Sequence, residues 1–408
     1  MKKSLYTLFV VSCIVTVGCE SKKSRRLVDI AEPTISVTDN DTLFHLKLNE
    51  TPLSNDFILS EVESIEPIYL EANDSSLVGR INMVALTDSL IVVQDNVSPG
   101  KILAFHLDGS FSHQIGSFGE GPNDYASINQ VFLDGNNVGI LDWKSSKIVK
   151  YDLKGDFISS TAFQKQTCPQ FIYPFKDGYI GTYSAYYDRN PFNIRIFDFD
   201  GFVTGTALPF KYDRPNTPGQ IVSDKNFGKL FYSTLCDSIY CITSSNVTPI
   251  GTFGVYRPSE VADFIESTSS LDAGEYRKAL SPASDLNIVN YVMITTMPDV
   301  WYIEYQTPQY CYSCVVDPAT FDSKKYLRTD IAKKFCYFPF VIAGKSGSGS
   351  LLSYIDEAAF TLLSKENLDY LRSTLSTKGC NLSLSEAAFE NSNPIILKFN
   401  LKKRSTNN

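Results

Sequence analysis

Short runs of alternating apolar and polar residues follow one another along most of the chain, and turn residues separate them. Alternation with a period of two is typical of half-buried strands. One pattern recurs every 46 residues, with a glycine at the same place each time (Gly109, Gly155 and Gly201), in the segments 101–111 (KILAFHLDGSF), 147–157 (KIVKYDLKGDF) and 193–203 (NIRIFDFDGFV). Two further strand-like runs precede each segment and one strand follows its glycine. Four short strands at this period predict one blade of a β-propeller.

Degenerate copies of the pattern continue toward the C-terminus. Residues 228–245 and 300–318 match the second and third strands of a fourth and a fifth blade, and 349–358 match the second strand of a sixth. An open ring would leave an unpaired strand edge, so we assign the strands expected in 60–71 and 393–403 to the sixth blade. The sequence therefore predicts an all-β fold, a six-bladed β-propeller of four-stranded blades over 57–403, closed by N- and C-terminal strands in one blade.

Two segments interrupt the strand pattern. Residues 257–287 predict short helices between the fourth and fifth blades, and the spacing of leucines in 358–380 predicts an amphipathic helix. Long insertions often carry function, but these could equally cover exposed sheet edges or the mouth of the central channel.

The blade pattern, with GSFGEGPNDY (116–125) linking one unit to LDWKSSKIVKYDLKGDF (141–157), resembles NHL-type repeats. It is most similar to the six-bladed β-propeller lipoproteins of Gram-negative bacteria. The resemblance covers roughly residues 57–403 and is specific over 80–205. It implies the fold and an envelope location, but it names no ligand or partner, because the biochemical role of that family is generally undefined.

The N-terminus has the features of a secretory signal. Lys2 and Lys3 precede an apolar run that is shorter than the roughly 20 residues needed to span a bilayer. The segment ends in TVGC, which resembles the lipobox of bacterial lipoproteins, although Thr16 replaces the usual leucine. We therefore expect a signal peptide over 1–18, lipidation at Cys19, a tether over 19–56 and a C-terminal tail over 404–408. An uncleaved anchor and cleavage without lipidation remain alternatives.

The negative net charge of the chain argues against nucleic acid as a partner. Loss of the signal peptide removes two lysines, so the formal net charge moves from −8 to −10. Such a chain repels nucleic acid, and it lacks a basic patch. The expected partners are the membrane, through the N-terminal lipid, and an envelope protein or a carbohydrate. We expect a monomer that is anchored in the outer membrane. We expect it to face the periplasm, because ESKK after Cys19 lacks the acidic run seen in surface-export signals of similar lipoproteins.

The residues that most often carry catalysis or bind metals are sparse. Three histidines are present, and none has the spacing of a converging zinc site. No G-x-S-x-G nucleophile motif occurs. Cys311 and Cys314 have a C-x-x-C spacing but lie in a predicted strand, where their side chains point to opposite faces, so we interpret them as core residues. We therefore expect no cofactor, no metal and no catalytic residue, although an enzymatic role stays open.

Carboxylates at the ends of second strands are the remaining candidates. Asp95, Asp142 and Asp188 would ring one mouth of the channel, where aspartate also commonly caps turns. The alternative is a calcium site, for which the sequence has no calcium-loop motif, or a polar ligand rim. The proposed rim residues are Asp95, Asn96, Asp142, Trp143, Tyr187, Asp188 and Arg189. The expected function is that of a membrane-anchored binding or scaffold module. The alternative is an envelope hydrolase or lyase with its site at the channel mouth.

Overall fold

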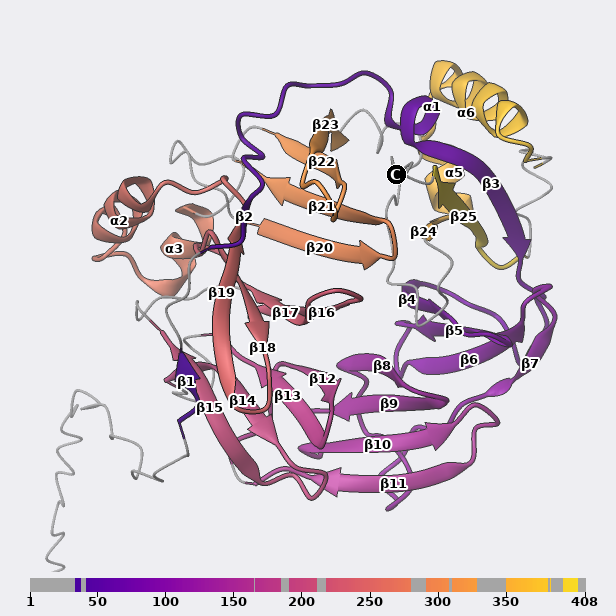
Figure 1. Ribbon diagram of the computed structural model, residues 1–408. Coiled ribbons are helices and arrows are strands. Elements are labelled where there is room, and N and C mark those ends of the chain that lie inside the picture. The colour runs from indigo at the N-terminus through magenta and orange to yellow at the C-terminus, as the bar shows by residue number, and fades with distance from the viewer. Residues whose placement is uncertain are drawn as a thin grey trace, which may run out of the picture. The chain divides into compact units, whose positions relative to one another are not determined.

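The computed structural model describes residues 34–37, 42–164, 166–184, 191–210, 218–279, 291–307, 310–328, 350–380, 382 and 392–402. Contacts divide the chain into two units, 1–31 and 32–408. Within the second unit, six β-sheets are arranged in a ring, which confirms the predicted six-bladed β-propeller (Figure 1). Among the described residues, no helix is long and apolar enough to cross a membrane.

The first three blades each contain four antiparallel strands. The first blade consists of β4 (Ile81–Leu86), β5 (Leu90–Asp95), β6 (Lys101–His106) and β7 (Phe111–Gln114). The second consists of β8 (Gln130–Asp134), β9 (Asn137–Asp142), β10 (Lys147–Asp152) and β11 (Phe157–Ala162). The third consists of β12 (Phe171–Phe175), β13 (Gly178–Thr182), β14 (Phe192–Phe197) and β15 (Val203–Pro209).

The fourth and sixth blades depart from the plain four-stranded pattern, and the fifth keeps it. The fourth consists of β16 (Gln220–Asp224), β17 (Gly228–Tyr232), β18 (Ser238–Ile242) and β19 (Asn246–Thr252), with β1 (Ser36–Val37) and β2 (Phe44–His45) added to β19. The fifth consists of β20 (Tyr291–Met297), β21 (Val300–Gln306), β22 (Cys311–Val316) and β23 (Ser323–Leu327). The described strands of the sixth are β24 (Ser350–Ile355), β25 (Ile395–Leu401) and β3 (Val62–Tyr69).

The glycine that recurs every 46 residues lies in the turn between the third and fourth strands of each of the first three blades. Gly109 and Gly201 have φ angles of 90° and 84°, a region that favours glycine. A Cβ at Gly109 would lie 1.9 Å from the carbonyl oxygen of Tyr69, and one at Gly201 would lie 2.4 Å from that of Ala162. Both carbonyls belong to the last strand of the preceding blade. The repeated glycine therefore allows each blade to pack against its neighbour.

The ring closes as predicted. β25, near the C-terminus, pairs with β24 on one side and with β3, from the N-terminal part of the chain, on the other. Buried side chains of these strands, including Ile65, Leu397 and Phe399, join one hydrophobic cluster with Tyr302 and Val315 of the fifth blade. The sixth blade therefore joins both ends of the propeller sequence.

Residues from the second half of the segment predicted as a tether, 19–56, contact the propeller. β1 and β2 pair in parallel with β19, and Thr34 forms a bridge with Thr206. Phe44 is 4% exposed and stacks on Phe321, with ring centroids 4.2 Å apart. Burial of this apolar surface holds the segment on the fourth and fifth blades. We call residues 42–56 the N-terminal strap, and they are part of the folded unit.

Both predicted insertions contain helices. α2 (Pro258–Ser267) and α3 (Ala273–Ala279) follow β19, and their Phe264 and Tyr276 are buried in the cluster between the fourth and fifth blades. The single helix predicted in 358–380 is instead two, α5 (Glu357–Leu362) and α6 (Lys365–Thr377). Ser364 begins α6 because its hydroxyl accepts a hydrogen bond from the Asn367 N–H.

β3, the last strand of the sixth blade in sheet order, is preceded along the chain by α1 (Phe57–Glu61), which lies next to α6 in Figure 1. The hydroxyl of Tyr370 in α6 donates to Asp56, which caps α1, at 2.7 Å. Leu371 and Leu375 are buried in the same cluster as Phe57. This insertion therefore covers apolar surface at the sixth blade, which agrees with the covering role.

Candidate ligand-binding face

One end of the blades carries the longer connections. The first and second strands of a blade form an antiparallel hairpin, so the first begins where the second ends; Ile81 pairs with Asp95, for example. Connections that enter a first strand and those that follow a second strand therefore lie at the same end, which we call the loop face. Segments 115–129 and 143–146 belong to it, whereas the opposite end has tight turns such as 135–136.

Asp95 lies at the loop face and is 3% exposed. Its Oδ1 accepts hydrogen bonds from the N–H groups of Arg80 (2.9 Å) and Val97 (3.1 Å), and its Oδ2 accepts from Gly79 N–H (3.2 Å). The neighbouring Asn96 is exposed, and its N–H donates to Arg80 O at 2.8 Å. The carboxylate thus fixes the connection that enters the first blade.

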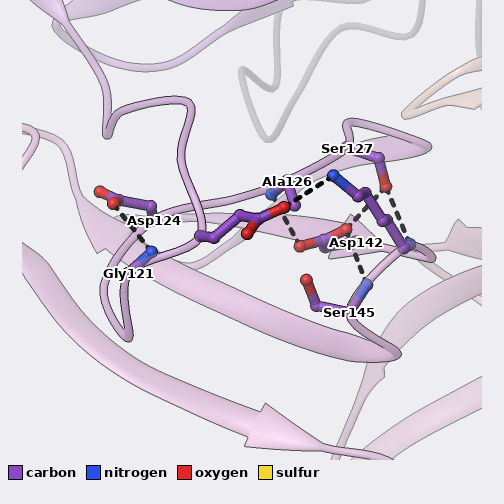
Figure 2. A network of polar contacts seen from close by, with 8 residues as sticks. Gly121, Asp124, Ala126, Ser127, Asp142 and Ser145 are labelled. Carbon is purple, nitrogen blue, oxygen red and sulfur yellow. Dashed lines mark hydrogen bonds and ion pairs between the residues drawn. The ribbon is translucent and has the colours of Figure 1, made fainter.

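Asp142 has the same role in the second blade, where it is fully buried (Figure 2). Oδ2 accepts from Ala126 N–H at 2.9 Å, and Oδ1 accepts from the Ser127 hydroxyl at 2.7 Å and from Ser145 N–H at 3.2 Å. Burial alone raises the pKa of Asp142, but the hydrogen bonds from Ser127, Ala126 and Ser145 outweigh it and hold the pKa below its ordinary value. These contacts support the turn-capping interpretation.

The glycine-rich connection that enters the second blade folds around Asp124. Its carboxylate accepts hydrogen bonds from the Ser117 hydroxyl and from Gly121 N–H, the second of which is drawn in Figure 2. A Cβ at Gly119 would lie 2.5 Å from Asp124 Oδ2. The N–H of Tyr125 donates to Ser117 O at 3.1 Å. The side chains of Ser117 and Asp124 therefore hold the shape of this loop, and the strand β8 follows it.

Trp143 is 37% exposed although it follows a buried strand. Its backbone N–H donates to Asn129 Oδ1 at 3.0 Å, and its indole Nε1 donates to Pro169 O at 2.8 Å. Asn129 Oδ1 lies 2.8 Å from the hydroxyl of Ser127, which also contacts Asp142. The network that the buried carboxylate organises therefore holds the backbone of Trp143, and Pro169 O orients its indole.

The structure brings together only part of the proposed rim. Asp95 with Asn96 and Asp142 with Trp143 lie at equivalent corners of neighbouring blades. Tyr187, Asp188 and Arg189 lie outside the described residues, and β13 already ends at Thr182, before Asp188. A ligand role for this set stays a prediction.

A buried polar cluster on the fifth blade was not predicted. Glu304 of β21 is 3% exposed and forms an ion pair with Arg328, and the hydroxyl of Tyr302 donates to it at 2.8 Å. Ser313 lies 2.6 Å from the Tyr302 hydroxyl. Burial raises the pKa of Glu304, and the nearby charge of Arg328 opposes the shift. The signal in the sequence was a glutamate in the apolar run VWYIEYQ.

The C-x-x-C pair and the possible metal ligands have the following surroundings in the described part of the chain. Cys311 and Cys314 are both free thiols in β22, and Cys314 is buried, as predicted for a core position. Burial raises the pKa of Cys311 to about 11, which disfavours the reactive thiolate. Across the described ranges, no group of three or more His, Cys, Asp or Glu side chains has a geometry that could hold a metal ion.

Solved structures share the fold at low sequence identity. A Bacteroides fragilis NCTC 9343 protein, described as a candidate exported protein, is 16% identical, with a TM-score of 0.66 over 90% of this chain and 100% of that one. A Bacteroides vulgatus protein of the DUF4221 family is 12% identical, with a TM-score of 0.51 over 84% of this chain and 99% of that one. These similarities support the fold alone.

Sequence comparison identifies the family. No protein of curated function shows significant similarity to the chain. The family model for a domain of unknown function, DUF4934, matches residues 43–400, which span the strap and all six blades. The N-terminal limit of this match agrees with the start of the strap rather than with the predicted tether boundary. The chain therefore belongs to the DUF4934 family.

Proposed function

We propose that the protein is an envelope lipoprotein, anchored through Cys19, whose propeller binds an envelope protein or a carbohydrate at the loop face. The basic n-region, the short apolar run and TVGC support cleavage after residue 18 and lipidation. The similarity to a candidate exported protein agrees with a location outside the cytoplasm. We place the anchor in the outer membrane with the propeller in the periplasm, and we retain the NHL-like interpretation of the repeats.

The asymmetry between the two ends of the blades carries this proposal. Between described strands, the opposite end has turns of two to six residues, whereas the loop face has connections as long as 115–129 and connections whose shape is maintained by buried carboxylates. Ligand sites commonly lie in loops that a rigid scaffold positions. Asp95 and Asp142 accept hydrogen bonds from backbone N–H groups, which suits a shaping role rather than proton transfer. Binding is therefore better supported than catalysis.

The proposal is tested by capture with matched variants. Val97, in the connection after β5, is 52% exposed, and Leu107, in the turn after β6 at the opposite end, is 50% exposed. The detergent-solubilised full chain is coupled to resin through its C-terminal tail and incubated with envelope extract, and the retained protein and hexose are measured. We expect Val97→Asp to retain several-fold less than the parent, and Leu107→Asp to retain as much as the parent.

Two results would contradict the binding proposal. One is a parent protein that retains nothing above uncoupled resin. The other is equal retention by the parent and both variants, because a ligand at the loop face should be sensitive to a charge at Val97. Thermal unfolding of the two variants provides the control for folding, since both side chains are about half exposed.

A further inference from the structure

Trp143 and its neighbours form an exposed cluster of aromatic and charged side chains on the second blade. We propose that this cluster, Phe118, Glu120, Trp143 and Lys144, is a platform for an uncharged saccharide; the proposal rests on the binding function above and names its ligand. We call these four residues the Trp143 patch. They belong to two connections of the loop face, and the Glu120–Lys144 ion pair joins them at 3.0 Å.

The exposure of Trp143 differs from that of related positions. The residue in the same place after the second strand of the first blade is the exposed polar Asn96, and in the third blade it is Tyr183, which is fully buried. Trp301, the other tryptophan of the chain, is also fully buried, with Nε1 donating to Asp224 at 2.7 Å. A large ring used only for packing would be expected to be buried in the same way.

The orientation of the ring is fixed before any ligand arrives. The backbone N–H and the indole Nε1 of Trp143 both donate hydrogen bonds, to Asn129 and Pro169 respectively. Asp142 holds Ser127, which contacts Asn129 in turn. A group ordered in advance loses less entropy on binding, so it gives more affinity for the same contact. The hydrogen bonds by which Asp142 caps the turn therefore also hold the backbone of Trp143 in place for a ligand.

The charges of the patch select the class of ligand. Glu120 and Lys144 are 82% and 58% exposed and neutralise each other. An exposed ion pair of this kind contributes at most about 1 kcal/mol to stability, so its groups remain available to donate and accept hydrogen bonds. A phosphate or carboxylate ligand would favour an unpaired cation, whereas sugar hydroxyls bind both signs of charge.

The exposed rings of Phe118 and Trp143 add apolar surface to these polar groups. Phe118 is 48% exposed and lies two residues before Glu120, with its ring packed edge to face on Tyr125 at 6.5 Å. The apolar face of a pyranose ring can pack on an indole, while its hydroxyls contact polar groups beside it. The Trp143 patch offers both kinds of contact on two connections that the Glu120–Lys144 ion pair joins.

Fluorescence quenching tests the ligand class directly, because one tryptophan is exposed and the other is buried. The detergent-solubilised full chain is titrated with maltotetraose, mannotetraose and tetra-N-acetylchitotetraose, and acrylamide quenching is measured at each step. We expect at least one of the three to lower the quenching of the exposed indole in a saturable way. A proline-rich peptide serves as the probe for the other class of aromatic-binding ligand.

Calorimetry with variants assigns the effect to the patch. Trp143→Ala should weaken binding of the active saccharide about tenfold or more, because loss of one stacking contact is worth about 1.4 kcal/mol. Glu120→Ala, at a position 82% exposed, should weaken it several-fold without affecting folding. Phe199→Ala, at a ring that is 53% exposed in the turn after β14, is the matched control and should bind as the parent does.

The proposal is overturned if no saccharide protects the indole, if only the peptide does, or if Trp143→Ala binds within about twofold of the parent. Failure of the saccharide proposal is distinct from failure of the binding function. In that case capture of envelope material would still be sensitive to Val97→Asp, and the ligand would contact another part of the loop face.

Discussion

The carboxylate of Asp142 links three segments of the second blade: the connection that enters it, the end of β9 and the turn that leads to β10. Asp95 does the same in the first blade. Their position at strand ends was predictable from the repeat, but their hydrogen-bond partners were not. Ala126 and Gly79 lie 16 residues before their aspartates, in irregular segments for which the sequence gives no geometry.

Substitution of Asp142 should separate its two roles. Asp142→Ala leaves buried N–H groups without an acceptor, and we expect a loss of about 3 kcal/mol in the free energy of unfolding. Asp142→Asn keeps one acceptor oxygen and should lose about half as much. Denaturant unfolding measures both. A change below about 0.5 kcal/mol in Asp142→Ala would contradict the turn-capping role.

The effect of Asp142→Asn should depend on pH. The pKa of Asp142 is lowered in the folded protein, so its carboxylate stabilises the fold above the unfolded pKa of about 3.9. That contribution is lost as the pH falls through the lower, folded value. We therefore expect the stability difference between the parent and Asp142→Asn to be full at pH 7 and to shrink below about pH 4. A difference that is constant from pH 7 to pH 3 would contradict this.

At the scale of elements, the strap is the main feature that the sequence did not predict. Phe44, Leu46 and Leu48 are buried and alternate with polar residues, but the strand that β2 pairs with lies about 200 residues later. A short parallel pairing of this kind has no local signature. The helical insertions, by contrast, were predictable because their apolar spacing is local.

Adjacent residues of the strap provide a matched test. Phe44→Ala should cost about 3 kcal/mol in the free energy of unfolding, since it removes a ring stacked in the core. Leu43→Ala, at a side chain that is 66% exposed, should change it by less than about 0.5 kcal/mol. If both substitutions were neutral, the strap would be a free linker.

The closing strand can be tested by truncation. Deletion of 393–403 removes β25, which lies between β24 and β3, so both neighbours lose their ladder partner. We expect aggregation or loss of cooperative unfolding. Removal of the tail 404–408 alone is the control and should leave the melting temperature unchanged. A monomeric protein that lacks 393–403 and melts at the parent temperature would contradict the shared blade.

For the whole molecule, the repeat and its degenerate copies predicted six blades and their order, and the strands expected in 60–71 and 393–403 predicted the closure. The buried Glu304–Arg328 pair could not be predicted, because Glu304 lies in β21 and Arg328 follows β23, and only the folded blade brings them together. The Trp143 patch could be predicted only in part. The repeat placed Trp143 at the loop face, but only the structure joins its connection to the one that carries Phe118 and Glu120.

The proposed lipid anchor on Cys19 determines where the whole molecule is located. Lipidation buries acyl chains at about 0.8 kcal/mol per CH₂, so several chains on Cys19 would hold the propeller on a membrane. Cys19→Ser should move the protein from the membrane pellet to the soluble fraction, and it should abolish incorporation of labelled fatty acid. Sedimentation of the substituted protein with membranes, without labelling of either form, would exclude the lipoprotein assignment.

Photo-cross-linking in intact cells tests whether a ligand binds at the loop face. A photoreactive phenylalanine is placed at Val97 on the loop face or at Leu107 at the opposite end, two sites of nearly equal exposure. We predict a discrete cross-linked envelope component at Val97 and none at Leu107. Equal cross-linking at both sites, or at Leu107 alone, would contradict the account.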